Sequence, residues 1–321
     1  MEYITFKNSD IKVSKLCLGC MSFGEANVGQ YQWTLDYDSS KKIIDEAIKL
    51  GINYFDTSNN YSNGTSEQFL GKTIKEYDRS KLVIESKCYF NEGKLSPEAI
   101  HRELSKSLNN LQTDYLDIYV MHRYDYDTKV EDTLLALKEE LAKGRIRYYG
   151  LSAMYASQFE EYCLKAKELD MPLPLTLQNH YNLIYREDEK ELIPLANKYG
   201  INRTPFSPFA AGRLSRKDYA SDSLRFTLDS KEGTRYDKTI EMDKKIVERV
   251  YEISQKYNTS MTNVCLSWEF IKGNASVLIG ITKLKYLEDA INCFSISLTE
   301  EDINYLDELY TEHPVNCNRW V

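Results

Sequence analysis

The sequence lacks the signals that would direct a protein into a membrane or out of the cell. No window approaches the ~20 apolar residues of a membrane-spanning helix. The first five residues have neither the basic start nor the apolar run of a secretory signal. The formal net charge of -8 disfavours nucleic acid and anionic membranes as partners. We therefore expect a cytoplasmic protein that acts on a small molecule, with the oligomeric state left open.

Disulfide and metal frameworks are also missing. The seven cysteines are odd in number and scattered, which suits free thiols in a reducing compartment. Cys17 and Cys20 have the spacing of a redox or metal motif, but they lie in a strand-like run. Three strand residues separate two thiols by roughly 10 Å and turn them to opposite faces. We interpret both as packing residues.

Three common catalytic or cofactor-binding patterns are absent as well. No strand-like run is followed by Gly-x-Gly-x-x-Gly, so the sequence does not support a nicotinamide-binding Rossmann domain. No nucleophile stands beside a base, and no cluster of metal ligands occurs. Because no linker or low-complexity segment interrupts the chain, we predict a single domain over residues 1–321.

Apolar runs recur at the spacing of one strand-helix unit, and helical periodicity fills the intervals. Eight such units predict an α/β fold, a closed parallel (β/α)8 TIM barrel. The predicted strands cover residues 15–21, 52–58, 82–87, 116–122, 146–153, 175–181, 201–207 and 276–282.

Three segments depart from this rhythm. Residues 2–14 predict an N-terminal hairpin at the barrel floor, and residues 298–310 predict an extra C-terminal helix capped by Thr299 and Asp302. Nearly seventy residues separate the last two predicted strands, and the excess covers about residues 209–239. A long insertion of this kind in a compact domain is usually a lid or binding loop.

Four polar side chains fall at or just after the ends of successive predicted strands. They are Asp56, Tyr61, Lys87 and His122. Catalytic groups of a (β/α)8 barrel sit at the strand C-termini, so we expect the four to meet. Taken singly, a strand-end Lys is usually a surface cation and a lone His is usually structural. The set as a whole indicates a site.

The chemistry of this set is consistent. A buried Asp56 needs a cation, and Lys87 supplies one. An ammonium beside a phenol favours the phenolate, so we expect Lys87 to lower the pKa of Tyr61 and make it a general acid. His122 would hold a carbonyl oxygen. The arrangement suits protonation of the oxyanion that forms when hydride reaches a carbonyl carbon.

These residues lie in motifs that resemble the aldo-keto reductase superfamily. The carrying segments are Leu18-Gly19-Cys-Met-Ser-Phe-Gly24, Gly51-Ile-Asn-Tyr-Phe-Asp-Thr-Ser-Asn-Asn-Tyr61, Val83-Ile-Glu-Ser-Lys87, Gln178-Asn-His-Tyr-Asn-Leu183, Ser207-Pro-Phe-Ala-Ala-Gly212 and Ile279-Gly-Ile-Thr-Lys283. The likeness is collinear from about residue 3 to residue 310. Residues 178–189, with His313 in the tail, resemble the subgroup of aryl-alcohol dehydrogenases and general aldo/keto reductases.

The resemblance implies a catalytic tetrad of Asp56, Tyr61, Lys87 and His122, with Tyr61 as proton donor, and NADP(H) bound across the barrel mouth. The cofactor contacts that it implies are Gly19, Cys20, Met21, Asp56, Ser152, Gln178, Phe206, Ser207, Phe209, Gly212, Leu214, Gly280, Thr282, Lys283 and Tyr286. Ser152 and Gln178 would meet the nicotinamide carboxamide, and Phe206 would stack on the ring. The pyrophosphate would lie under the loop from Ser207 to Leu214, and the adenosine end would meet Gly280, Thr282 and Lys283.

This chain departs from the family pattern at three positions. Ala153 replaces the Asn or Ser that usually follows the carboxamide-binding Ser, and Tyr286 and Ala290 stand where an Arg or Gln and an Asn commonly face the adenine. Selectivity for NADP would then rest on Lys283, helped by Arg213, Arg225 or Arg235. Each lid Arg has the alternative of an exposed surface charge.

The resemblance implies an NADPH-dependent reductase of aldehydes or ketones. An alternative from another class is a cofactor-binding regulatory subunit that resembles potassium-channel β-subunits and turns over little. A metal-dependent hydrolase or isomerase is less well supported, because the remaining histidines are scattered. The substrate is not readable. Phe23, Tyr89, Tyr124, Tyr181 and the tail around Trp320 are candidates for the pocket wall or, equally, for core packing.

Overall fold

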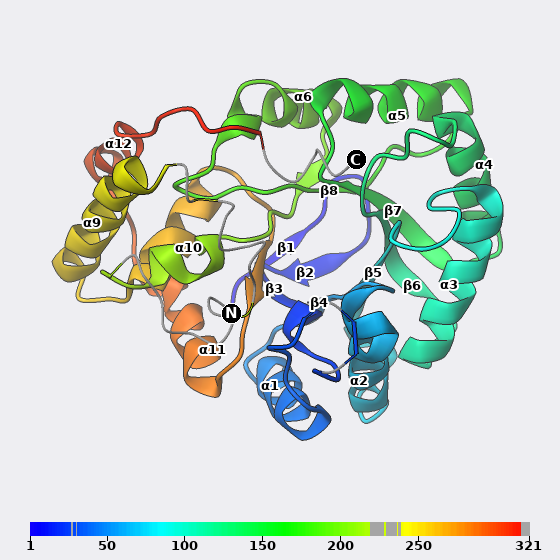
Figure 1. The fold of residues 1–321 in the computed structure, drawn as a ribbon, viewed down its shortest axis with the longest axis horizontal. Coiled ribbons are helices and arrows are strands. Elements are labelled where there is room, and N and C mark those ends of the chain that lie inside the picture. The colour runs from blue at the N-terminus through cyan, green and yellow to red at the C-terminus, as the bar shows by residue number, and fades with distance from the viewer. Residues whose placement is uncertain (27, 30, 219–227, 229–235, 237–238, 316–321) are drawn as a thin grey trace.

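The central element of the structure is a barrel of eight parallel strands, seen in the middle of Figure 1. The computed structural model describes residues 1–321 except 27, 30, 219–227, 229–235, 237–238 and 316–321. The hydrogen-bonded order is β10-β3-β4-β5-β6-β7-β8-β9. Backbone bonds from Ala275 N to Arg203 O and from Leu278 N to Pro205 O join β10 to the chain at β9. The strands are β3 (Leu16–Gly19), β4 (Tyr54–Asp56), β5 (Val83–Cys88), β6 (Leu116–Met121), β7 (Ile146–Ser152), β8 (Thr176–Gln178), β9 (Asn202–Arg203) and β10 (Val277–Gly280).

Helices surround this barrel (Figure 1), which confirms the predicted α/β barrel class. Local sequence explains where several begin. The Ser96 side chain accepts from Ala99 N at the start of α3, and Pro97 occupies its first turn. The helices are α1 (Tyr37–Lys49), α2 (Thr65–Ile74), α3 (Pro97–Leu111), α4 (Val130–Ala142), α5 (Ala156–Glu168), α6 (Leu192–Tyr199), α9 (Ile240–Lys256), α10 (Met261–Ile271), α11 (Leu284–Ala290) and α12 (Glu300–Asp307).

The additional C-terminal helix forms as the sequence predicts. The Thr299 side chain accepts from Asp302 N, and the Asp302 carboxylate accepts from Thr299 N. These reciprocal bonds form a capping box at the start of α12.

The apolar core has one layer inside the barrel and another between the sheet and the helices. Cys17 packs inside with Tyr54 and Val120, whereas Cys20 packs in the outer layer. Both are free and buried. The predicted interpretation of these two cysteines as packing thiols on different faces is confirmed.

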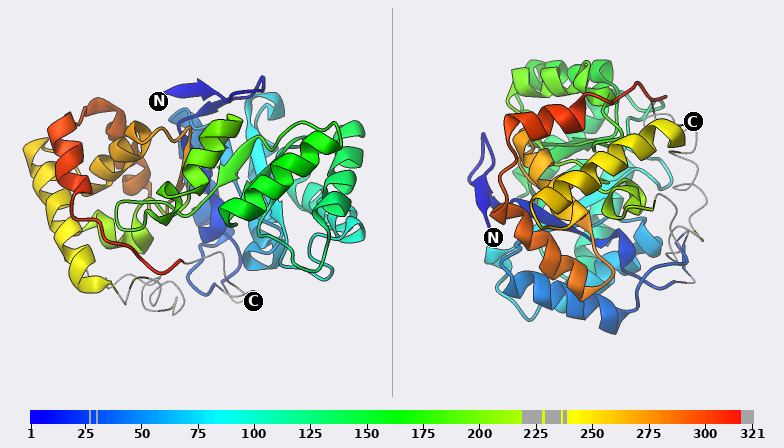
Figure 2. Two further views of the ribbon diagram at one scale, coloured as in Figure 1. Left: turned by 90° about the horizontal axis from the view of Figure 1, so that it is seen from above. Right: turned by 90° about the vertical axis from the view of Figure 1, so that its left-hand side faces the viewer.

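The predicted N-terminal hairpin is also present. Strand β1 (Tyr3–Thr5) pairs antiparallel with β2 (Lys12–Ser14), and Figure 2 (left) shows this pair across one end of the barrel. Phe6 from its turn meets Tyr54 edge-on inside the barrel, with ring centroids 5.9 Å apart. The hairpin therefore covers the barrel floor.

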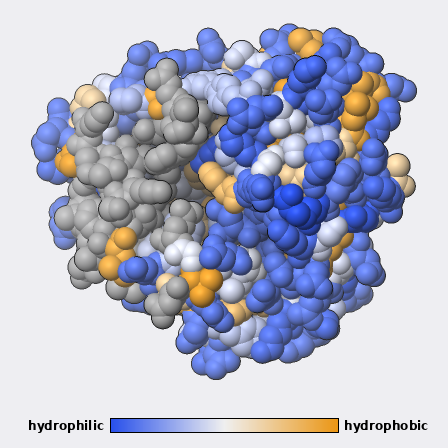
Figure 3. All heavy atoms as spheres, turned by 45° about the vertical axis from the view of Figure 1, so that its right-hand side comes forward, coloured by the Kyte–Doolittle hydropathy of each residue, from blue (hydrophilic) through white to orange (hydrophobic). Residues whose placement is uncertain are grey.

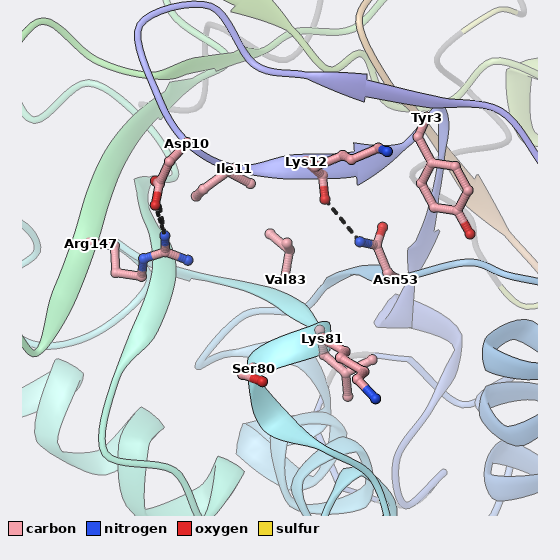
Figure 4. Close-up of a pocket in the computed structure, with 10 residues that line it drawn as sticks. Tyr3, Asp10, Ile11, Lys12, Asn53, Ser80, Lys81, Val83 and Arg147 are labelled. Atoms are coloured by element: carbon pink, nitrogen blue, oxygen red, sulfur yellow. Dashed lines mark hydrogen bonds and ion pairs between the residues drawn. The ribbon is translucent and has the colours of Figure 1, made fainter.

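A cavity of about 460 Å³ lies beneath this hairpin (Figure 4). Its charged side chains already have partners. Arg147 donates to Asp10 at 2.9 Å, Lys12 lies over the Tyr3 ring, and Lys81 pairs with Asp78 at 3.6 Å. The bond from Arg147 to Asp10, together with the bond from Asn53 Nδ2 to the Lys12 carbonyl at 2.9 Å, ties the hairpin to the barrel at the end opposite the C-terminal strand ends (Figure 4).

The seventh barrel strand is shorter than the predicted residues 201–207. Only Asn202–Arg203 form β9, because Pro205 has no N–H to donate to a ladder. Pairing resumes at a single parallel bridge between His180 and Phe206. The chain then enters the 3-10 segment Ala210–Ser215, while Arg225 and Arg235 lie outside the described residues.

The surface in Figure 3 is mostly hydrophilic where its residues are described, with apolar side chains in small groups. Among the helices that the structure describes, none has the length and apolarity needed to cross a membrane.

Candidate active site

Parallel pairing brings the predicted site residues to one edge of the sheet. In the register, Gly280 of β10 pairs with Gly19 of β3, and Gly19 pairs with Asp56 of β4. Ser152 of β7 pairs with Gln178 of β8. Because the C-terminal ends of parallel strands share one end of a barrel, residues far apart in sequence meet there.

Three of the four tetrad side chains are in direct contact. The Lys87 ammonium lies 2.6 Å from Asp56 Oδ1, and it donates to Tyr61 Oη at 3.2 Å and to the Thr57 carbonyl at 2.8 Å. Lys87 is fully buried, Asp56 is 2 % exposed and Tyr61 is 7 % exposed. The partner that Asp56 was predicted to need is therefore Lys87.

The segment that carries Tyr61 is tightly bent. Tyr61 begins the 3-10 turn Tyr61–Gly64, in which Ser62 and Asn63 have φ of 47° and 52°. Such left-handed conformations cost free energy in residues with a Cβ, and they concentrate at functional sites. The bend follows Tyr61 directly, and the phenol itself lies beside Lys87 of β5.

The net pKa direction of Tyr61 differs from the sequence-based expectation. Burial raises the pKa, the charge of Lys87 lowers it, and the charge of Asp56 raises it again, so that the outcome is above the ordinary value. The lowering by Lys87 is present but is outweighed by burial. The phenol thus stays protonated at neutral pH and keeps its proton available to an acceptor.

His122 completes the group. Its Nδ1 lies 3.3 Å from Ser58 Oγ, and its ring packs against Tyr61 with centroids 5.9 Å apart. Burial holds the pKa of His122 well below its usual range, and the charges of Lys87 and Arg123 act in the same direction. The imidazole is neutral at neutral pH and can offer one N–H to an oxygen.

Sequence reasoning missed two neighbours of these groups. Phe90 is 44 % exposed and packs against the His122 ring, with ring centroids 5.1 Å apart. Nothing in its local sequence pattern distinguishes it from the other aromatic residues. Glu85 precedes Lys87 by two residues, so strand alternation places both on the inward face. That periodicity was a readable signal for Glu85.

Glu85 belongs to a buried polar network below the tetrad. Tyr54 Oη donates to Glu85 Oε2 at 2.5 Å. The Gln178 amide nitrogen donates to Glu85 Oε1 at 2.6 Å and to Asp56 Oδ1 at 2.9 Å. Gln178 thus joins the tetrad to the barrel interior.

The residues predicted for the nicotinamide end lie beside this network. Ser152 is 1 % exposed, and its Oγ has no hydrogen-bond partner among the described residues. Its neighbour Ala153 has a φ of 45°. Phe206 is half-buried, with its ring stacked on His180 at 5.3 Å. Two further predicted cofactor contacts, which the resemblance assigns to no particular end of the cofactor, are Cys20, which is buried, and Met21, which is half-buried.

The residues predicted for the pyrophosphate form a strained loop. Ser207, Ala210, Ala211 and Gly212 all have positive φ. Consecutive N–H groups in such turns form concave sites that suit anions. Phe209 is half-buried here.

Two members of this predicted set are core residues. Leu214 is fully buried, so its side chain packs rather than facing a ligand. Arg213 is 1 % exposed, with its guanidinium over the Tyr236 ring, which does not present it to a phosphate at the surface.

The predicted adenosine end is open. Gly280 is exposed at the end of β10, and a Cβ added there would meet nothing within 4 Å. Thr282, Lys283 and Tyr286 are exposed, with Lys283 Nζ 5.9 Å from the Tyr286 ring centroid.

The aromatic candidates for the pocket wall occupy different kinds of position. Phe23 is fully buried, and Tyr181 is 1 % exposed and stacks on Trp268 at 5.2 Å, so both are packing residues. Tyr89 and Tyr124 remain near the barrel mouth, at the ends of β5 and β6. Trp320 lies outside the described residues.

The other histidines are placed structurally. His101 contacts Glu140, His180 stacks between Tyr185 and Phe206, and His313 pairs with Asp243 at 3.0 Å. Among the residues that the structure describes, no three His, Cys, Asp or Glu side chains are grouped to hold a metal ion.

Known proteins are similar to this chain in both sequence and fold. The chain matches the aldo/keto reductase family over residues 15–311. It is 36% identical to a Schizosaccharomyces pombe protein named "Putative aryl-alcohol dehydrogenase", with 96% of this chain and 95% of that protein covered. It is 32% identical to versiconal hemiacetal acetate reductase from Aspergillus parasiticus, over 98% and 99% of the two chains.

A solved structure gives the same result for the fold. A thermostable aldo-keto reductase, Tm1743, crystallised with the inhibitor epalrestat, superposes with a TM-score of 0.79 at 26% identity. The similarity covers 96% of this chain and 100% of that one. The predicted resemblance is confirmed: this chain belongs to the aldo/keto reductase family and is an oxidoreductase of that family.

Proposed function

We propose that the protein is an NADPH-dependent reductase that converts aldehydes or ketones to alcohols, with Tyr61 as the general acid. The observation that carries the proposal is the buried contact of Lys87 with both Asp56 and Tyr61. An ammonium at this place stabilises the phenolate that remains once the phenol has given up its proton.

Each tetrad residue has a separate task. The neutral His122 donates an N–H to the substrate carbonyl oxygen and fixes the carbonyl beside Tyr61. As the carbonyl carbon accepts hydride, its π electrons move to oxygen, and the Tyr61 proton transfers there. Asp56 holds Lys87 in place throughout.

The residues of the barrel mouth fit a nicotinamide dinucleotide, which would supply the hydride. Ser152 Oγ is a buried hydroxyl that still needs a partner. Residues 207–212 offer a concave run of backbone conformations for a pyrophosphate. Lys283 is exposed near the end of β10 and would favour the 2′-phosphate of NADP.

The test replaces Tyr61 by Phe. General acid catalysis contributes about 10²- to 10⁴-fold to a rate, so Tyr61→Phe should lower kcat by that factor and leave NADPH binding in place. Tyr124→Phe is the matched control, because the Tyr124 hydroxyl bonds to Glu161 instead. A Tyr61→Phe protein with wild-type reductase activity would refute the assignment.

A regulatory subunit that binds cofactor with little turnover is separated from an enzyme by steady-state kinetics. A panel of aldehydes and ketones is offered with NADPH, and NADPH oxidation is followed at a cofactor concentration that saturates binding. We expect turnover. Tight binding of NADPH without oxidation by any member of the panel would favour the regulatory alternative.

A further inference from the structure

The interior network contains a carboxyl group for which the reduction just described has no task. Glu85 is fully buried and lies opposite Asp56 in the register of β4 and β5. Burial raises the pKa of Glu85 well above its ordinary value, and the negative charge of Asp56 raises it further. Glu85 is therefore uncharged at neutral pH, and its carboxyl proton is hydrogen-bonded to Asp56. The charge of Lys87 is balanced by Asp56 alone.

The bonds of Gln178 determine what that side chain can offer to a ligand. A glutamine amide has two N–H donors on nitrogen and one carbonyl acceptor. One donor reaches Asp56 Oδ1 at 2.9 Å and the other reaches Glu85 Oε1 at 2.6 Å. With both donors engaged in the interior, only the carbonyl oxygen is left for a molecule at the barrel mouth.

The hydrogen bond to Glu85 is what engages the second N–H of the Gln178 amide. Asp56 alone would hold one N–H and leave the second free to turn toward the mouth. Tyr54 Oη donates to the other carboxyl oxygen, Glu85 Oε2, at 2.5 Å and leaves Oε1 to Gln178. The polarity that Gln178 presents is thus set by a residue that touches no ligand.

We propose that Glu85 is a positioning residue that restricts Gln178 to accepting a hydrogen bond, so that the site selects a pyridine ring bearing a carboxamide N–H2. This inference rests on the proposed function, because it assumes that Gln178 faces the nicotinamide. It predicts discrimination against a dinucleotide in which that N–H2 is replaced by a methyl group.

The experiment compares NADP⁺ with its 3-acetylpyridine analogue by fluorescence titration of the full-length protein. The wild type should bind NADP⁺ about fivefold more tightly, the value of one neutral hydrogen bond. In Glu85→Met the freed N–H can donate to the acetyl oxygen, so the two affinities should become equal. A purely structural loss would weaken both dinucleotides by the same factor and leave their ratio at about fivefold.

Two control variants keep the Gln178 bond. Glu85→Gln retains a neutral acceptor of the same shape, and Tyr54→Phe removes only the other partner of Glu85. Both should keep the wild-type ratio of affinities. Glu85→Leu is made in parallel as a second apolar variant, and it should lose the discrimination as Glu85→Met does.

The outcomes separate this inference from the proposed function. A wild type that binds both dinucleotides equally, or a Glu85→Met protein that still discriminates, overturns the role of Glu85 while the reductase assignment stands. A wild type that binds neither dinucleotide refutes the proposed function and this inference together.

Discussion

The buried ion pair between Lys87 and Asp56 gives a sharp prediction about stability. Lys87→Met leaves Asp56, only 2 % exposed, without its cation. Removing one partner of a buried pair costs about 3–5 kcal/mol, because the remaining charge is uncompensated. Gln178 still donates to Asp56 at 2.9 Å, so we expect a loss near the lower limit, about 3 kcal/mol.

The double variant Asp56→Asn with Lys87→Met should recover most of this loss. The unpaired charge is gone, and the amide that replaces the Asp56 carboxylate still accepts from Gln178 through its carbonyl oxygen. Recovery stays incomplete by about 1 kcal/mol, because the Thr57 carbonyl loses its bond from Lys87. Both variants should be inactive as reductases, so that stability and catalysis are separated.

The assay is urea denaturation followed by circular dichroism, with free energies extrapolated to water. Lys49→Met serves as the control, because Lys49 pairs with Glu46 at 2.9 Å but its side chain is 74 % exposed. Lys49→Met should have nearly the same free energy of unfolding as the wild type, because an exposed ion pair contributes little to stability. A Lys87→Met protein as stable as the wild type, or a double variant no more stable than Lys87→Met, would contradict this account of the buried pair.

Two further predictions concern other parts of the fold. Burial lowers the pKa of His313, but its bond and charge pairing with Asp243 outweigh this and raise it, so the pair stabilises fully below about pH 6.5 and loses its effect as pH rises through the raised pKa. The loss of stability in His313→Gln should accordingly be larger at about pH 6 than at about pH 9 in urea titrations, and a loss that grows with pH would contradict it. Gly71→Ala should destabilise by about 1–3 kcal/mol, because its Cβ would lie 2.5 Å from the Leu111 backbone where α2 crosses α3, whereas Gly280→Ala has open space. Equal urea midpoints for Gly71→Ala and Gly280→Ala would contradict this prediction, because they would mean that α2 and α3 move apart without loss of stability.

Much of the site was readable because barrel geometry converts sequence spacing into proximity. Asp56 and Lys87 stand at the ends of consecutive predicted strands, and parallel strand ends share one edge. The capped helix α12 was readable for a local reason, since Thr299 and Asp302 bond to each other across three residues. These are effects of short range or of strict periodicity.

The polarity and protonation of the site depend on contacts that no periodicity encodes. The pKa of Tyr61 rises because burial outweighs the nearby ammonium, and burial is a property of all the surrounding elements together. Tyr181 lies in the same motif as Gln178 but turns away to stack on Trp268. A strand pattern gives the face of a residue, and it does not give the depth of that face.

The sequence by itself determined the family and the barrel, and it predicted which four side chains form the site, because strand order and strand ends follow from residue spacing. Only the tertiary structure decided that Gln178 uses both donors on Asp56 and Glu85. That choice depends on three strands, with Gln178 lying 122 positions from Asp56 and 93 positions from Glu85 in the chain. Hydrogen-bond direction is fixed by distances of a few tenths of an ångström, which form only when the whole barrel is assembled.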